Sequence, residues 1–88
     1  MIRLPALMQY YTDKADNFAV EGQTVLEAVR AAAILFPALQ PHLFDAKNEL
    51  RRHVNLFVNG ISIRDLAGAE TAVSEQDVVR ILPSISGG

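Results

Sequence analysis

The chain has 88 residues, of which half are hydrophobic and 20% are charged, and its net charge is −2. This length suits one small domain, and the apolar share is high enough for a core, which excludes a disordered chain. A domain of this size leaves little room for a deep internal active site. Eight basic residues face ten acidic ones, so the chain lacks the positive charge that nucleic-acid binding requires, and we expect no such partner.

Two absences narrow the class of protein further. No apolar run reaches the roughly 18–20 residues of a membrane span, and residues 1–5 carry no signal-peptide pattern, so we expect no membrane partner and a cytoplasmic location. Cysteine is absent, which excludes disulfides, thiolate metal ligands and cysteine nucleophiles. His42 and His53 lack partner ligands at a suitable spacing, so the sequence predicts no metal site.

The first two strands are expected near the N-terminus. Residues 2–4 alternate between apolar and basic side chains, which favours a short half-buried strand. Pro5 ends it, because proline cannot donate to a strand ladder. After a polar, turn-rich stretch, residues 18–21 favour a second strand, which Gly22 stops. Together they predict a hairpin with a long connection.

The clearest helix begins after Thr24, whose hydroxyl can cap the first turn, with Glu27 three residues later as in a capping box. Pro37 ends it, since the residue before a proline avoids the helical region. The apolar residues expected on its buried face are Leu26, Val29, Ala33 and Phe36, with Val25 and Ala32 widening that face.

Residues 37–52 form an irregular, polar segment with prolines at its start. A short helical turn is expected at about residues 39–44. The apolar side chains expected to pack as a satellite against the core are Leu39, Leu43, Phe44 and Leu50. Residues 51–53 form a short basic cluster, which is either a solvated loop end or a docking contact for an acidic partner.

The remaining strands lie in the C-terminal third. Residues 54–58 predict a strong strand, and Asn59-Gly60 is the favoured two-residue hairpin turn, because both positions tolerate positive φ. Residues 61–63 form the return strand, and residues 78–82 form the last strand. Between them, residues 64–74 show no clear periodicity and are expected to be a plain connection.

The order of elements predicts an α+β fold. A single amphipathic helix cannot bury its apolar face alone, so it must lie across a sheet. We expect the first and last strands to be central and parallel. This is the β-grasp, or ubiquitin-like, arrangement, with a mixed sheet of about four to five strands packed on one main helix. Residues 1–83 are expected to form this domain and residues 84–88 a flexible C-terminal tail.

The sequence carries no recognisable catalytic constellation, so it predicts no catalytic residue and no enzyme. The α-carboxylate of Gly88 is its one unusual group, because adenylation would turn a carboxylate oxygen into a leaving group. Gly87 and Gly88 lack Cβ atoms and would let the backbone thread a narrow channel. Ser86 precedes them, and Ile85 is the one apolar anchor of the tail. Glycine-rich ends also occur by chance, so an interaction domain with an incidental tail stays an alternative.

Residues 75–88 combine an acidic turn, an apolar strand, a proline, a short spacer and Gly-Gly. This block resembles the ThiS/MoaD family of ubiquitin-like sulfur carriers, as do residues 54–60 and the helix start at Thr24. The resemblance implies that an adenylyltransferase similar to ubiquitin-activating enzyme would adenylate Gly88, using ATP and magnesium. A sulfur donor would then form a thiocarboxylate, whose sulfur would pass to a precursor on an acceptor enzyme. The chain itself would bind no cofactor.

Within the family, residues 37–52 and the ending 81–88 are most similar to carriers paired with cysteine synthase-like enzymes or with siderophore thiocarboxylate pathways. In those systems a JAMM-type zinc metalloprotease releases the product. The small subunit of molybdopterin synthase is an alternative, but this chain has only Pro83 where that subunit carries more proline or aromatic character. A ubiquitin-like modifier joined through Gly88 to lysines is a further alternative.

A docking face follows from strand alternation. In the last strand, Val79 and Ile81 should point to the helix, which leaves Arg80 and Leu82 on the open face. In the third strand, Phe57 should point outward. Phe57 and Leu82 would then form an exposed apolar patch beside the tail, and such patches often mark interfaces. Alternatively, both are ordinary half-buried sheet residues.

Overall fold

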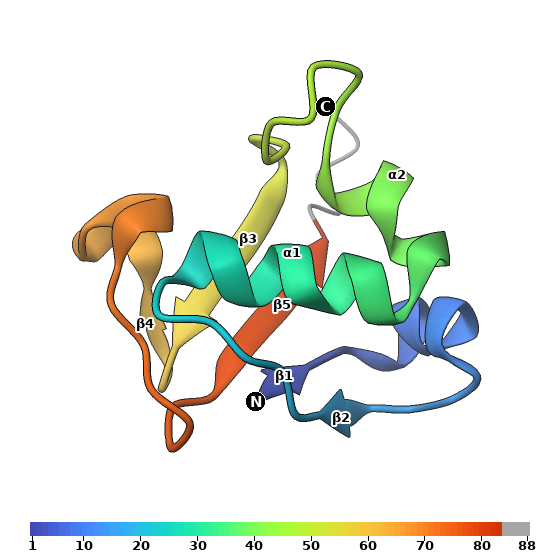
Figure 1. The fold of residues 1–88 in the computed structure, drawn as a ribbon, viewed down its shortest axis with the longest axis horizontal. Helices are drawn as coiled ribbons and strands as arrows, with labels where there is room; N and C mark the ends of the chain where they lie inside the picture. Colours follow the sequence, from blue (N-terminus) through green and yellow to red (C-terminus); the bar gives the residue numbers. More distant parts are fainter. Residues whose placement is uncertain (84–88) are drawn as a thin grey trace.

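The computed structural model describes residues 1–83. They form a five-stranded mixed sheet in the order β2-β1-β5-β3-β4, with helix α1 (Val25–Leu35) across one face (Figure 1). The strands are β1 (Ile2–Arg3), β2 (Asn17–Phe18), β3 (Val54–Val58), β4 (Ile61–Ser62) and β5 (Val79–Pro83). Central strand β5 runs parallel to β1 and antiparallel to β3. The predicted β-grasp arrangement, with its first and last strands side by side and parallel, is therefore confirmed.

The N-terminal hairpin is shorter than the sequence predicts. β2 covers Asn17–Phe18 instead of residues 18–21, and only two residues of each strand are paired. The connection contains a 3-10 helix, η1 (Ala6–Thr12), that the sequence did not predict. The buried Thr12 hydroxyl closes its end by donating to the Ala15 carbonyl oxygen at 2.7 Å. Such local side-chain to backbone hydrogen bonds compete with regular strand pairing, which fits the short hairpin seen here.

Helix α1 starts as predicted. The Thr24 hydroxyl accepts a hydrogen bond from the Glu27 N–H at 3.2 Å, which satisfies one of the free donors of the first turn. The Glu27 carboxylate reaches back to the Gln23 N–H at 3.2 Å, one residue before the cap. The predicted pair of Thr24 and Glu27 is therefore confirmed. The Glu27 carboxylate bonds the N–H of Gln23, whereas in a standard capping box it would bond the N–H of Thr24.

The buried face of α1 is centred on smaller residues than predicted. Its buried residues are Val25, Ala28, Val29, Ala32 and Ala33. Leu26 and Phe36, which spacing alone placed on this face, are half-buried at its margins. Alanine side chains let the helix axis approach the sheet closely, so the larger apolar side chains lie beside the contact and not within it.

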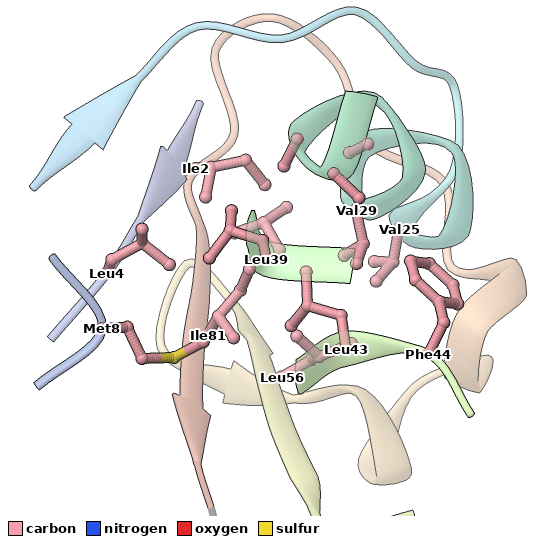
Figure 2. Close-up of a cluster of buried hydrophobic side chains, with 14 of the residues drawn as sticks. Ile2, Leu4, Met8, Val25, Val29, Leu39, Leu43, Phe44, Leu56 and Ile81 are labelled. Carbon is pink, nitrogen blue, oxygen red and sulfur yellow. The ribbon is translucent and has the colours of Figure 1, made fainter. Parts of the chain in front are cut away.

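The segment after α1 completes the core, and the prediction that it packs as a satellite was wrong in that respect. It forms a 3-10 turn η2 (Pro37–Leu39) and a short helix α2 (Gln40–Leu43). Leu39 and Leu43 have no exposed surface and Phe44 has 2%. Figure 2 shows these side chains among those of α1, β1, β3 and β5, in the space between helix and sheet. The predicted short helical turn is confirmed.

Residues 63–70 contain two 3-10 turns that the sequence did not predict, η3 (Ile63–Asp65) and η4 (Gly68–Glu70). The chain then meets the start of α1, where the Val25 N–H donates to the Thr71 carbonyl oxygen at 2.9 Å.

Across residues 1–83, no helix has both the length and the hydropathy needed to cross a membrane.

Candidate docking face and tail root

The tail root is the end of β5 from which residues 84–88 continue. Pro83, the last residue of β5, pairs with Val54, the first residue of β3. The four residues predicted to react or to thread a channel lie outside the described residues: Ile85, Ser86, Gly87 and Gly88. Their roles therefore stay predictions, while the structure defines the surface beside them.

Strand alternation separates the two faces of the sheet as predicted. The residues of β3 and β5 on the helix side are at most 7% exposed: Leu56, Val58, Val79 and Ile81. The opposite face, which we call the open face, carries the intervening residues. Arg80 is exposed there, whereas Phe57 and Leu82 are half-buried.

The strand register brings the three predicted docking residues together. Phe57 lies directly opposite Arg80, and Leu82 lies opposite Asn55, so Phe57 and Leu82 are diagonal neighbours on one face. Neither apolar side chain is among those packed against the core. Both are half-buried and not fully exposed. A role in docking stays a prediction.

Arg3 is an open-face residue that our sequence analysis did not select. In the parallel pair β1–β5 it lies opposite Arg80. It is exposed, while Ile2 and Leu4 on either side of it are buried. The signal was present in the apolar-basic-apolar alternation of residues 2–4, but the pairing with Arg80 depends on the long-range register of two strands at opposite ends of the chain.

The basic cluster of residues 51–53 lies just before β3, close to the tail root. The Arg51 Nε donates to the Pro41 carbonyl oxygen at 2.9 Å, which ties the cluster to α2. The Arg52 carbonyl oxygen accepts from the Arg64 guanidinium at 3.0 Å. These contacts give Arg51 and Arg64 a structural role in the loop, and the alternative role as a docking contact stays a prediction.

The other end of β5 is held by a carboxylate. The Asp77 carboxylate accepts from the Asn59 side-chain amide at 2.8 Å and from the Ser74 N–H at 2.8 Å. The Asn59 hydrogen bond first, and then the bond from Ser74, lowers the pKa of Asp77 below its ordinary value. Asn59 and Gly60 have φ of 50° and 87°, as the predicted hairpin turn requires. Asp77 thus connects the β3–β4 turn to the start of β5.

Comparison with known proteins identifies the family. The sequence model of the ThiS family matches residues 2–88, which is nearly the whole chain. The chain belongs to the ThiS family. A curated relative, the sulfur carrier protein CysO of Mycobacterium tuberculosis, is 26% identical over 89 residues, which cover 99% of this ThiS-family chain and 96% of the relative.

Solved structures agree with this assignment. The small archaeal modifier protein SAMP1 of Methanosarcina acetivorans matches the ThiS-family chain with a TM-score of 0.87 and 30% identity, over 99% of this chain and 93% of SAMP1. A chain in the crystal structure of the Amycolatopsis orientalis BexX/CysO complex matches with a TM-score of 0.85 and 26% identity, over 99% and 97% of the two chains. The ubiquitin-like fold is common to all of them.

The two histidines and the hollow beside one of them are the remaining places to look for a metal or catalytic site among residues 1–83. Within residues 1–83, no group of three His, Asp or Glu side chains is placed to hold a metal ion. His42 is exposed on α2, and its ring stacks on Tyr11 with centroids 4.0 Å apart. Beside this pair is a hollow of about 310 Å³ lined by Leu7, Met8, Tyr11, His42, Val54 and Ile81. Its lining is mainly apolar and contains no nucleophile with an adjacent base.

Proposed function

We propose that this ThiS-family chain is a sulfur carrier protein and not an enzyme, with Gly88 as the carrier residue. The observation that carries the proposal is the extent of the match. The family model reaches residue 88, and the alignment with the sulfur carrier protein CysO covers almost the full length of both chains. The position of the open face next to the tail root, with Phe57, Arg80 and Leu82 together on it, supports the same role, because a carrier must present its end to other proteins.

The chemistry follows from the carboxylate. A carboxylate resists nucleophiles until one of its oxygens becomes part of a leaving group. A partner adenylyltransferase with ATP and Mg²⁺ would join the Gly88 carboxylate to AMP and release pyrophosphate. Hydrosulfide supplied by a donor would then attack the acyl carbon, AMP would leave, a proton would be released, and Gly88 would end as a thiocarboxylate. The chain contains no cysteine, so the transferred sulfur would be carried at Gly88 and not on a side chain.

The partners of this reaction are proteins that contact the open face and receive the tail. We propose that Phe57, Arg80 and Leu82 dock the adenylyltransferase while residues 85–88 enter its active site. The sulfur would then pass to an acceptor enzyme, in cysteine synthesis or in the synthesis of a thiocarboxylate metabolite such as a siderophore. A JAMM-type metalloprotease would release the product, and the whole cycle would take place in the cytoplasm.

A second function is favoured by one specific observation. At 30% identity, the solved relative SAMP1 is named a modifier protein. Activation of Gly88 by adenylation would serve protein modification equally well, with a lysine amine in place of the sulfur nucleophile. The two functions therefore differ in the atom that attacks the acyl carbon, and the same activated chain can be offered to both nucleophiles.

The test uses the full chain with an adenylyltransferase of the same organism, Mg-ATP and sulfide. We expect the intact mass to rise by the difference between one sulfur and one oxygen, and the gain to lie on the C-terminal peptide. That location separates it from oxidation of Met1 or Met8, which adds an almost equal mass. A variant lacking Gly88 is the control and should show no gain.

Two results would decide against the carrier. Amide-linked adducts with lysines in cell extracts, without any thiocarboxylate, would assign the chain to protein modification. Absence of pyrophosphate exchange with every adenylyltransferase of the organism would contradict both activated forms and leave an interaction domain.

A further inference from the structure

The strand residues of the open face carry positive charge and no carboxylate. Alternation and register place on this face the following side chains of the five strands: Asn17, Arg3, Arg80, Leu82, Asn55, Phe57 and Ser62. The two charged residues among them are both arginines. This contrasts with the whole chain, whose net charge is −2.

Arg3 and Arg80 are neighbours on the two central parallel strands. Adjacent strands are about 4.8 Å apart, so the register places the two arginines side by side on the same face, and like charges at neighbouring positions disfavour a sheet. Asp16, just before β2, accepts a hydrogen bond from the Asn17 side-chain amide at 2.7 Å. We expect the repulsion between the two arginines to lower the stability of the isolated domain slightly, and a carboxylate bound between them would offset that effect.

The neighbours of this pair indicate a macromolecule and not a small anion. The face is one side of a five-stranded sheet, and Arg80 is bordered on its other side by Phe57, with Leu82 diagonal to Phe57. A guanidinium binds a carboxylate through two parallel N–H donors, and it remains charged at any physiological pH. A ligand that uses the whole surface must therefore offer carboxylates next to an apolar contact, as the surface of a folded protein does.

We propose that Arg3 and Arg80 form a paired-arginine site that receives carboxylate side chains of the adenylyltransferase, beside the apolar contact at Phe57 and Leu82. This inference rests on the proposed function, because it names the chemistry of the partner's surface. Arg3 and Arg80 would set which partner docks and how fast, while Gly88 carries out the transfer. Exposed charges at the rim of an interface act mainly on the association rate.

The experiment measures the association rate constant with the adenylyltransferase by stopped flow, for full-length chains at low and high salt. Arg3→Glu and Arg80→Glu should each lower the rate constant about tenfold at low ionic strength, and the loss should shrink as salt screens the charges. Arg3→Lys should lose less, because it keeps the charge but not the planar fork. The matched control is Lys14→Glu, which makes the same charge change at an exposed residue in the connection before β2.

A stability measurement separates docking from a structural role. Arg3→Gln should leave the midpoint of urea unfolding unchanged or raise it, because it relieves the repulsion with Arg80. A fall in that midpoint, or an equal loss of association with Lys14→Glu, would overturn the proposal. A second experiment replaces acidic residues of the adenylyltransferase with lysine, one at a time, and measures whether any replacement restores the association rate of the Arg80→Glu variant. Restoration identifies the carboxylate that the site receives, and failure of every such substitution rejects a carboxylate ligand.

The outcomes distinguish this inference from the proposed function. If wild-type chain is adenylated and the arginine variants associate as fast as wild type, the paired-arginine site alone is rejected. If wild-type chain is not adenylated by any such enzyme, the carrier function fails, and the site fails with it.

Discussion

The side chains on the two faces of the sheet differ in how deeply they are buried. On the helix side, Leu56 and Ile81 are at most 1% exposed and pack with α1 and α2 (Figure 2). On the open face, Phe57 and Leu82 are half-buried, and Arg3 and Arg80 are exposed. One face therefore supplies the hydrophobic stabilisation of the domain, and the other carries the residues that we predict to dock partners. Substitutions that affect one face and not the other test this division.

The largest effect is expected from truncating the core beneath α2. Leu43 has no exposed surface, so Leu43→Ala leaves a cavity and should lower the free energy of unfolding by about 2–5 kcal/mol. Urea denaturation measures this. The control is Leu66→Ala, because Leu66 is 42% exposed, and its change should stay within about 0.5 kcal/mol. If Leu43→Ala were equally mild, residues 37–44 would be a satellite, as the sequence suggested, and not part of the core.

A smaller effect is expected where the chain passes close to the helix backbone. A Cβ on Gly22 would lie 2.7 Å from the Ala28 backbone nitrogen. Because neither backbone can yield cheaply, Gly22→Ala should lower the free energy of unfolding by about 1–3 kcal/mol. Gly60→Asn is the control: nothing lies within 4 Å of a Cβ there, and Asn tolerates the positive φ. If both substitutions lowered the free energy of unfolding equally, the need for glycine at residue 22 would come from its backbone freedom and not from the close approach to α1.

On the open face, a truncated side chain should affect partner binding more than the stability of the domain. Phe57→Ala should lower the free energy of unfolding by less than about 1 kcal/mol, because this ring lies outside the core. It should still lower association with the adenylyltransferase about tenfold, as the loss of a buried aromatic contact does at interfaces. The adjacent residue provides the control, since Leu56→Ala should cost about 2–5 kcal/mol. If Phe57→Ala unfolds the domain as readily as Leu56→Ala, Phe57 belongs to the stabilising side and the division of faces is wrong.

The sequence predicted the parts of the fold that local chemistry decides. Thr24 and Glu27 marked the helix start, Asn59-Gly60 marked the tight turn, and alternation in β3 and β5 separated their faces, because caps, turns and strand periodicity depend on near neighbours. Contacts between distant segments were less accessible. From the sequence, Leu39 and Leu43 were expected in a satellite and not in the centre of the core, and no 3-10 turns were predicted in residues 63–70. Short apolar stretches without periodicity are compatible with several structures.

The candidate site was predicted to a similar extent. Phe57, Arg80 and Leu82 follow from alternation within single strands, and the structure places all three on the open face. Arg3 was missed because its importance comes from its partner, and the β1–β5 register joins residues 77 positions apart in the chain. The reactive end was inferred from the type of its residues and from resemblance, and residues 84–88 lie outside the part that the structure describes.

The smallest expected effect concerns the hydrogen bonds of Asp77, which help to fix the register between β3 and β5. A shift of one residue between β3 and β5 would exchange the two faces of a strand, and Asp77 holds the turn of one strand against the start of the other. The pKa of Asp77 is lowered in the folded chain, so near that pKa the unfolded chain binds more protons, and stability rises with pH. The contribution is complete above the ordinary carboxyl range, about pH 4, and is lost as the pH falls through the lowered pKa.

Asp77→Asn should remove this pH dependence. We expect its urea midpoint to fall below that of wild type at pH 7, and the difference to narrow as the pH falls through the lowered pKa of Asp77 and its carboxylate takes up a proton. Glu75→Gln removes a charge two residues away and keeps these hydrogen bonds, so its difference from wild type should be smaller at every pH. A difference for Asp77→Asn that stays constant with pH would mean that Asp77 acts through its shape and not its charge. The register would then depend on the Asn59 turn and on the packing of the helix-covered face alone.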